Sequence, residues 1–356
     1  MTDVAPPSHL EGVQAYYGTR LASSADLRTD ACTTTALPPP RMRDALARVH
    51  PEVLARYYGC GLVAPEALEG TTVLDLGCGA GRDVYALAQC VGERGRVIGV
   101  DATHGQLTVA QRHEEWHRAA FGYRQSNVRF VEHDIERLDT LDVPAESVDV
   151  AVSNCVFNLL QDKGAAFRQV HRLLRRGGEF YFSDVYADRR LPASLLQDPV
   201  LVGECLAGAL YWNDFLSLAR AAGFGDPRLV TSRRLGIGDP GIADRLGSAR
   251  LYSATWRLFK LEGLDGSCEE YGQAVRYDGG VPGVEERLDL DGHHPFEAGK
   301  IVRVCGNTWR MLHDTRFRPW FSFFGDFSRH YGIFAGCGTS LPFAEDGAAR
   351  AGGGCC

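Results

Sequence analysis

The sequence feature that most constrains the fold is the run VLDLGCGAGRD at residues 73–83. A short apolar stretch leads into glycines at alternate positions, and a helix-compatible segment follows. This order predicts a strand, a tight turn and a helix whose N-terminal N–H groups can approach a ligand closely. The spacing is GxGxG, not the GxGxxG of a dinucleotide site. Asp75, just before the turn, would oppose a pyrophosphate but suit an ammonium, which favours S-adenosylmethionine (SAM) over NAD.

Further predicted strands follow the glycine turn and alternate with helical patterns. They lie at residues 96–100, 127–131, 147–153 and 178–183, and later strands at 228–231 and 252–259 complete a seven-stranded sheet. Alternation of this kind predicts a parallel sheet with ligands at the C-terminal ends of the strands. Asp101 ends the second strand and is placed to bind both ribose hydroxyls, while Asp134 and Ile135 suit the edge and face of an adenine. We therefore expect an α/β, Rossmann-like, SAM-dependent methyltransferase fold.

The length of 356 residues and changes in pattern along the chain predict four parts. They are a mobile N-terminal helical and loop segment (1–62), the SAM-binding domain (63–262), a small C-terminal α+β domain (263–343) and a disordered Gly/Cys tail (344–356). We expect disorder over residues 1–12, a short helix or lid over 13–27 and a helical stretch over 40–58. A helix over about 193–210 should carry Cys205, and Asn213 should cap a helix over 214–222.

Bulk composition excludes several classes of protein. Hydrophobic residues make up 45% and charged residues 23%, which is ordinary for a globular chain. No run approaches the roughly 20 apolar residues of a membrane span, and the N-terminus lacks a signal-peptide pattern. The net charge of −7 argues against nucleic acid. We expect a cytoplasmic, monomeric enzyme that binds neither membranes nor nucleic acid.

The eleven cysteines are the unusual part of the composition. Under reducing conditions such thiols pack in cores, bind metals or perform chemistry, and the absence of a CxxC pair argues against a zinc ribbon. We expect Cys90, Cys268 and Cys305 to be small buried hydrophobes. Four others stand at less ordinary positions: Cys32 in a polar loop, Cys60 between glycines, Cys155 directly after the fourth strand, and Cys205.

Five segments together resemble the arsenite methyltransferase family, and the resemblance extends over about residues 13–317. The segments are CTTTA from Cys32, RYYGCG from Arg56, VSNC from Val152, YFSDVY from Tyr181 and GECLAGALYW from Gly203. The resemblance implies that Cys155 and Cys205 bind trivalent arsenic, that Cys60 supplies a third sulfur and that Cys32 is its redox partner. The SAM-contacting set that we expect is Tyr58, Asp75, Gly77, Cys78, Gly79, Asp101, Ala102, Thr103, Gln106, Asp134, Ile135 and Asn154.

The chemistry of arsenic suits these residues. Trivalent arsenic is thiophilic, and thiolates are the soft ligands that such a centre selects. Arsenic bound by three sulfurs keeps a lone pair that can attack the SAM methyl group, so no general base is needed. Two nearby thiols can then supply two electrons by forming a disulfide, which glutathione or thioredoxin restores. The expected substrate is arsenite or its thiol conjugates.

Two other classes of protein remain open at this point. Another small-molecule methyltransferase, of the quinone or sterol type, shares the fold but gives no reason for loop cysteines at Cys32 and Cys60. A thiol-rich binder of metalloids or zinc without catalysis explains the cysteines but not Asp75 and Asp101.

Overall fold

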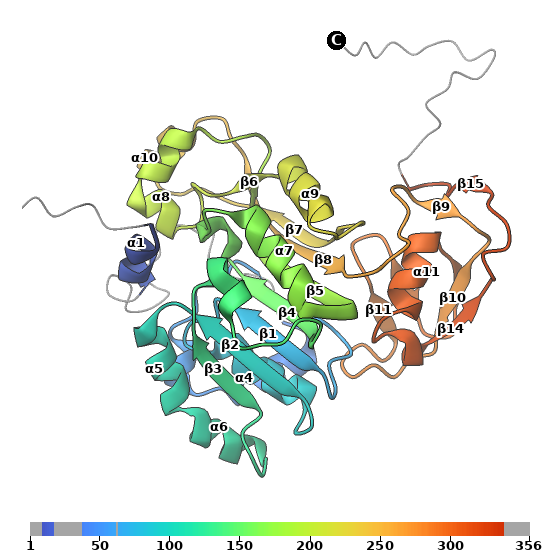
Figure 1. Cartoon of the computed structure of the whole chain (residues 1–356), viewed down its shortest axis with the longest axis horizontal. Helices are drawn as coiled ribbons and strands as arrows, with labels where there is room; N and C mark the ends of the chain where they lie inside the picture. Colours follow the sequence, from blue (N-terminus) through green and yellow to red (C-terminus); the bar gives the residue numbers. More distant parts are fainter. Residues whose placement is uncertain (1–8, 18–37, 62, 338–356) are drawn as a thin grey trace, which may run out of the picture.

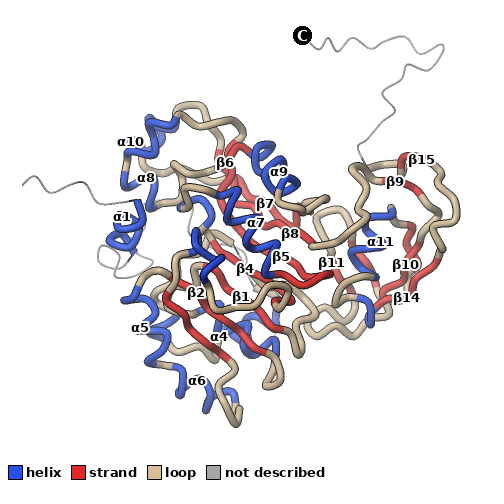
Figure 2. Tube along the Cα trace, in the orientation of Figure 1, coloured by secondary structure: helices blue, strands red, loops and turns tan. Residues whose placement is uncertain are grey.

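The centre of the molecule is an eight-stranded mixed sheet (Figures 1 and 2). The computed structural model describes residues 9–17, 38–61 and 63–337. The strand order is β3-β2-β1-β4-β5-β8-β7, with the short β6 paired to β5. The strands are β1 (Thr72–Leu76), β2 (Arg96–Asp101), β3 (Val128–Glu132), β4 (Val148–Asn154), β5 (Leu174–Ala187), β6 (Leu210–Tyr211), β7 (Arg228–Arg234) and β8 (Leu251–Phe259).

Strands β1 to β5 pair in parallel, whereas β8 runs antiparallel to β5 and β7 antiparallel to β8. The predicted Rossmann-like sheet is therefore confirmed. The helices around it are α2 (Pro40–Leu46), α3 (Pro51–Leu54), α4 (Arg82–Val91), α5 (His104–Arg112), α6 (Glu114–Phe121), α7 (Lys163–Leu173), α8 (Pro199–Gly203), α9 (Trp212–Ala221) and α10 (Pro240–Leu246). The 3₁₀ turns are η3 (Ile135–Thr140), η4 (Phe157–Leu159) and η5 (Ala193–Gln197).

Alternation along β1 divides the core between the two faces of the sheet. Val73 packs with the side chains of α4, and Leu74 packs with those of α7 and α9. Because successive side chains of a strand point to opposite faces, an apolar run buried on both sides is what a central parallel strand needs. The C-terminal ends of β1, β2 and β4 thus meet at one edge, between the two helical layers.

The C-terminal part is a small α+β unit beside the large sheet (Figure 1). It contains strands paired β13-β10-β14, β11-β12 and β15-β9, with α11 packed on them around an apolar cluster. Its elements are β9 (Glu269–Glu270), β10 (Ala274–Tyr277), β11 (Arg287–Asp289), β12 (Pro295–Glu297), β13 (Ile301–Arg303), α11 (Gly306–His313), η6 (Arg318–Trp320), β14 (Phe321–Phe324) and β15 (Gly332–Ile333). Within the described residues, no helix has the length and apolar character needed to cross a membrane.

Several helix boundaries differ from the sequence-based expectation. The first helix, α1 (His9–Ala15), begins inside the region expected to be disordered, so that expectation is wrong for residues 9–12. The stretch 40–58 is split into α2, which ends at Leu46, and α3, which begins at Pro51 with His50 as its N-cap, because the His50 side chain accepts a hydrogen bond from the Glu52 N–H. The predicted helix over 193–210 is replaced by η5 and the short α8, so Cys205 lies beyond a helix. Asn213 does not cap α9, which starts at Trp212.

Candidate functional site

A cavity at the C-terminal edge of the sheet is lined by all twelve residues expected to contact SAM. The turn after β1 shapes its floor, and Gly77, Gly79 and Gly81 all adopt positive φ angles (79°, 53° and 87°) that favour glycine. At Gly77 a Cβ would also lie 2.3 Å from Val156 Cγ2. Glycine at position 77 therefore lets the backbone of the turn pack closely against Val156, which follows β4, beside the cavity.

Two acids that line the cavity, Asp75 and Asp101, are buried and half-buried, respectively. Burial, together with the carboxylates of Asp83 and Asp101, raises the pKa of Asp75 well above its usual value. Asp75 Oδ2 receives no hydrogen bond from any described residue. Asp101 accepts hydrogen bonds from the N–H groups of Gly79 and Thr103, both at 2.8 Å, while burial raises its pKa. A cavity with an unsatisfied buried carboxylate oxygen fits a cationic ligand group such as the ammonium of SAM.

The N-terminal residues cover this cavity. The Gln14 side chain donates to the Ala102 carbonyl at 2.6 Å, and Gln106 donates to the Tyr17 carbonyl at 2.9 Å. Tyr17 in turn donates through its hydroxyl to the Gly203 carbonyl at 2.6 Å and lies 3.7 Å from Cys205 Sγ. Sequence reasoning missed Gln14 and Tyr17 as site residues. The one sequence signal that could indicate them is the aromatic pair at 16–17, directly before a glycine.

Cysteines gather next to the same cavity. The sulfur atoms of Cys60 and Cys155 and a carboxylate oxygen of Asp184 all lie within 4.8 Å of one another, and all three residues are buried. Cys155 also lines the cavity, and Cys205 Sγ donates to the Cys155 carbonyl at 3.1 Å. Cys205 was predicted to lie on a helix, but it follows α8 with a positive φ of 57°. Cys32 lies outside the described residues.

A chain of hydrogen bonds joins the cysteines to the cavity that Asp75 and Asp101 line. Asn154 Oδ1 accepts from the Cys60 N–H at 3.0 Å, while Asn154 Nδ2 donates to the Asp83 carboxylate at 3.1 Å. The Cys155 N–H donates to the Ser183 carbonyl at 2.8 Å, and Cys60 Sγ lies 3.6 Å from the Ser183 hydroxyl. The loop that carries Cys60 is thereby held against the ends of β4 and β5.

Asp184 is a site residue that sequence reasoning missed, although it stands in the YFSDVY segment. Its carboxylate accepts hydrogen bonds from the N–H groups of Asn158 and Val185. Burial, and secondarily the neighbouring Cys205, raises the pKa of Asp184 to about 8. Cys78, by contrast, is a packing residue of the glycine turn whose pKa is raised by burial.

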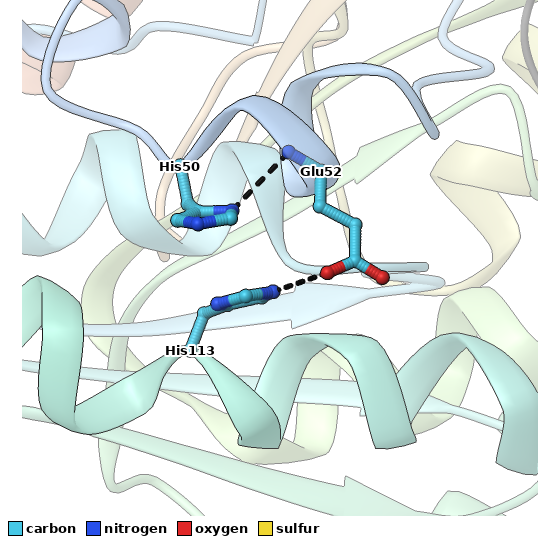
Figure 3. Close-up of side chains that lie close together, drawn as sticks. All are labelled: His50, Glu52 and His113. Atoms are coloured by element: carbon cyan, nitrogen blue, oxygen red, sulfur yellow. Dashed lines mark hydrogen bonds and ion pairs between the residues drawn. The ribbon is translucent and has the colours of Figure 1, made fainter.

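Another group of possible metal ligands, His50, Glu52 and His113, lies between α3 and α5 (Figure 3). The two imidazoles are stacked, with ring centroids 3.7 Å apart and an angle of 18° between the planes. His50 Nδ1 accepts the Glu52 N–H, and His113 Nε2 lies 2.6 Å from Glu52 Oε2. Because imidazole lone pairs lie in the ring planes, those of stacked rings run parallel and do not converge on one ion. The cluster is explained as a helix cap and an ion pair.

The parallel sheet, the glycine turn and the paired acids define a SAM-dependent methyltransferase. A methyltransferase-domain family model matches residues 67–223, and a model of the arsenite methyltransferase C-terminal domain matches residues 270–332. The arsenite methyltransferase of Aquipseudomonas alcaligenes is 56% identical over 346 residues, covering 97% of this chain and 99% of that protein. The chain therefore belongs to the arsenite methyltransferase family.

More distant relatives agree with this assignment. The human arsenite methyltransferase is 46% identical over 308 residues, covering 86% of this chain and 81% of that protein. The crystal structure of an arsenic(III) S-adenosylmethionine methyltransferase from Chlamydomonas reinhardtii superposes with a TM-score of 0.81 at 47% identity, covering 84% of this chain and all of that chain. The resemblance inferred from the sequence, and SAM as the cofactor, are confirmed.

Proposed function

We propose that this protein transfers the methyl group of SAM to trivalent arsenic held by the thiolates of Cys60, Cys155 and Cys205. The observation that supports this most strongly is the convergence of the Cys60 and Cys155 sulfur atoms beside the cavity that contains Asp75 and Asp101. A methyltransferase acting on oxygen, nitrogen or carbon has no need of buried thiols at that place.

SAM, when bound, supplies an electrophilic methyl group on its sulfonium. The residues of the chain position the two reactants. Asp75 holds the ammonium of SAM, Asp101 holds its ribose, and Cys155, which lines the same cavity, orients the arsenic. Arsenic in a three-thiolate site keeps a lone pair and carries no proton, so no base is required. Catalysis is then chiefly the conversion of a bimolecular displacement into an oriented one.

Methyl transfer leaves arsenic formally pentavalent, and a two-electron reduction must follow. In this proposal Cys32 and Cys60 supply the electrons by forming a disulfide, and glutathione or thioredoxin reduces it again. The position of Cys60 on a loop, and not within the sheet, favours this role. The Cys60 N–H donates to Asn154 Oδ1, and the Cys60 carbonyl accepts a hydrogen bond from the Ser253 hydroxyl. A cytoplasmic location and a monomeric state remain predictions.

The direct test is product analysis. Purified full-length protein is incubated with arsenite, SAM and a thiol reductant, and the arsenicals are separated by liquid chromatography with arsenic-specific detection. The proposal predicts methylated arsenicals formed in proportion to S-adenosylhomocysteine. Turnover of SAM with a quinone or sterol acceptor but none with arsenite would contradict it.

A further inference from the structure

The side chain of Asn154, the last residue of β4, is fully hydrogen-bonded within the protein. Its Oδ1 accepts the N–H groups of Cys60 at 3.0 Å and of Gly61 at 3.3 Å. Its Nδ2 donates to the Tyr57 hydroxyl at 2.8 Å, the Gly61 carbonyl at 3.0 Å and the Asp83 carboxylate at 3.1 Å. Two backbone donors that face one atom identify that atom as the oxygen. Because an amide offers two lone pairs and two hydrogens, Asn154 has no hydrogen bond left to give to a ligand.

The two glycines that flank Cys60 make room for these contacts. A Cβ at Gly59 would lie 2.5 Å from Asn154 Nδ2, and a Cβ at Gly61 would overlap the Ser183 hydroxyl. Neither glycine has a positive φ angle, so what each position requires is space and not a special backbone conformation. The loop is therefore shaped to lie directly against the ends of β4 and β5.

The backbone of Cys60 is held at both its N–H and its carbonyl. Ser253 on β8 donates through its hydroxyl to the carbonyl at 2.6 Å, and Asn154 accepts the N–H. Asn154 also directly precedes Cys155, whose sulfur lies within 4.8 Å of the Cys60 sulfur. One side chain therefore links the loop that carries the first thiol to the strand end that carries the second.

We propose that Asn154 is a positioning residue that holds the Cys60 thiol beside Cys155. An arsenical bound to both thiolates needs their sulfur atoms at a fixed separation, and a misplacement of about 1 Å can cost about a hundredfold in rate. This consequence for methylation rests on the proposed function of Cys60 as the third sulfur for arsenite. The positioning itself does not depend on arsenic, so the two proposals can fail separately.

Alkylation of Cys60 tests the positioning without arsenic. The full-length protein is reduced, the reductant is removed under argon, and the rate of modification by N-ethylmaleimide is measured by peptide mass spectrometry. Cys60 is only 2% exposed, so it should react only when its loop opens locally. Asn154→Ala removes the acceptor of the Cys60 and Gly61 N–H groups. The Cys60 rate should therefore rise at least about fivefold.

Thiols outside the loop separate local opening from a general loosening of the fold. Cys90 on α4 and Cys305 at the N-cap of α11 are buried, as expected, and should keep their wild-type rates in Asn154→Ala. Cys268 is unsuitable as a reference. It was expected to be buried but is half-buried, because it lies beside the two-stranded β15-β9 sheet. A parallel rise at all three buried thiols would overturn the proposal.

Asn307→Ala is the matched control variant. The Asn307 side chain is buried in the C-terminal part, where it accepts the Asp265 N–H at 2.7 Å and donates to the Asp226 carboxylate at 3.0 Å. Its removal costs hydrogen bonds of the same kinds but should leave the Cys60 rate unchanged. A wild-type Cys60 rate in Asn154→Ala, or an equal rise in Asn307→Ala, would overturn the proposal.

Tyr57→Phe replaces Asn154→Ala should that variant fail to fold. It removes the hydroxyl that bonds to Asn154 and to the Gly61 carbonyl, but it keeps the ring, whose centroid lies 3.5 Å from the Arg82 guanidinium. The Cys60 rate should rise at least about twofold, because one anchor of the loop is lost. A wild-type rate in Tyr57→Phe would then count as the refutation.

The ratio of the methylation rates on arsenite and monomethylarsenite is a readout that general destabilisation does not move. Asn154→Ala should lower this ratio at least about tenfold, because only arsenite needs the third sulfur. Asn307→Ala should leave the ratio unchanged. Faster alkylation of Cys60 with an unchanged ratio would support the positioning role and contradict Cys60 as the third sulfur. A lowered ratio without faster alkylation would overturn the positioning role.

Discussion

At the scale of single residues, two thiols of the proposed methylation site are held by unusual backbone geometry. Cys155 and Cys205 have φ angles of 62° and 57°, a left-handed conformation that residues with a side chain rarely adopt. Such strain costs on the order of 1 kcal/mol or more and persists where the surrounding structure enforces it. Sequence alone placed Cys155 correctly, because it follows a recognisable strand. It misplaced Cys205, because no local pattern reveals a positive φ outside glycine.

The two N-terminal cysteines should separate the first methylation from the second. Arsenite has three positions to fill with sulfur, whereas monomethylarsenite has two. If Cys60 is the third sulfur and Cys32 its redox partner, Cys32→Ser and Cys60→Ser should lose activity on arsenite yet retain it on monomethylarsenite. A rate assay with both substrates decides this. Equal retention of both activities would make the four-thiol mechanism untenable.

The acids of the cofactor cavity should determine SAM affinity. Removing the carboxylate in Asp75→Ala or Asp101→Ala should weaken binding by about 1.5–3 kcal/mol, the range for a hydrogen bond to a charged group. Isothermal titration calorimetry measures the change. Asp142→Ala is the control, since that side chain is 92% exposed and is not among the residues that line the cavity. Unchanged SAM affinity in both cavity variants would refute the assignment of these acids.

At the scale of elements, strands could be predicted more reliably than helices. The apolar runs of β1, β2 and β4 are buried on both faces, so their pattern is continuous and unambiguous. The sequence of residues 40–58 predicts one helical stretch, because its apolar spacing continues through Pro51. Tertiary contacts explain the break: the His50 N–H donates to His117 Nε2 at 3.1 Å, which anchors the loop to α6.

This anchor should make stability depend on pH. His117 stacks on Tyr85, uses Nε2 as an acceptor, and burial lowers its pKa to about 4. Because the unfolded pKa is about 6.5, the folded state binds the proton less tightly. The stability that neutral His117 contributes is complete above pH 6.5 and is lost as the pH falls toward 4. At pH 5 the free energy of unfolding should be lower by about 2 kcal/mol.

Urea denaturation from pH 7 to pH 5 measures this loss. The free energy of unfolding should depend less steeply on pH in His117→Phe, which keeps a stacking ring but has no proton to gain. The exposed His104→Gln serves as the control and should keep the wild-type slope. An unaltered pH dependence in His117→Phe would show that this histidine is not the group responsible.

At the scale of the whole molecule, a buried ionic network connects the C-terminal part to the large sheet. Glu179 on β5 lies 2.5 Å from Arg257 Nε on β8, and its other oxygen pairs with Arg316, which follows α11. Arg257 also pairs with Glu66, before β1. No sequence pattern predicted this network, because its members are far apart in the chain and each is an ordinary charged residue. The C-terminal domain itself was predicted from a change in pattern, but its attachment was not.

Removing one member of this network should lower the stability of the fold. Glu179→Gln leaves the buried guanidinium of Arg316 without a carboxylate and that of Arg257 with Glu66 alone, and the free energy of unfolding should fall by about 3–5 kcal/mol. The control is Glu262→Gln, which removes an exposed partner of Arg176 and should cost less than about 1 kcal/mol. Chemical denaturation of both variants measures the difference. A loss in Glu179→Gln no larger than that of the control would mean that the network contributes little.

The central claim is that thiolates beside the SAM cavity hold arsenic for methylation, and the most direct measurement compares Cys155→Ser with the wild-type chain. Methylated arsenicals are quantified with arsenite and with monomethylarsenite, and SAM affinity is measured on the same preparations. The account predicts that Cys155→Ser binds SAM like the wild type but methylates neither arsenical. Appreciable methylation of either substrate by Cys155→Ser would contradict it.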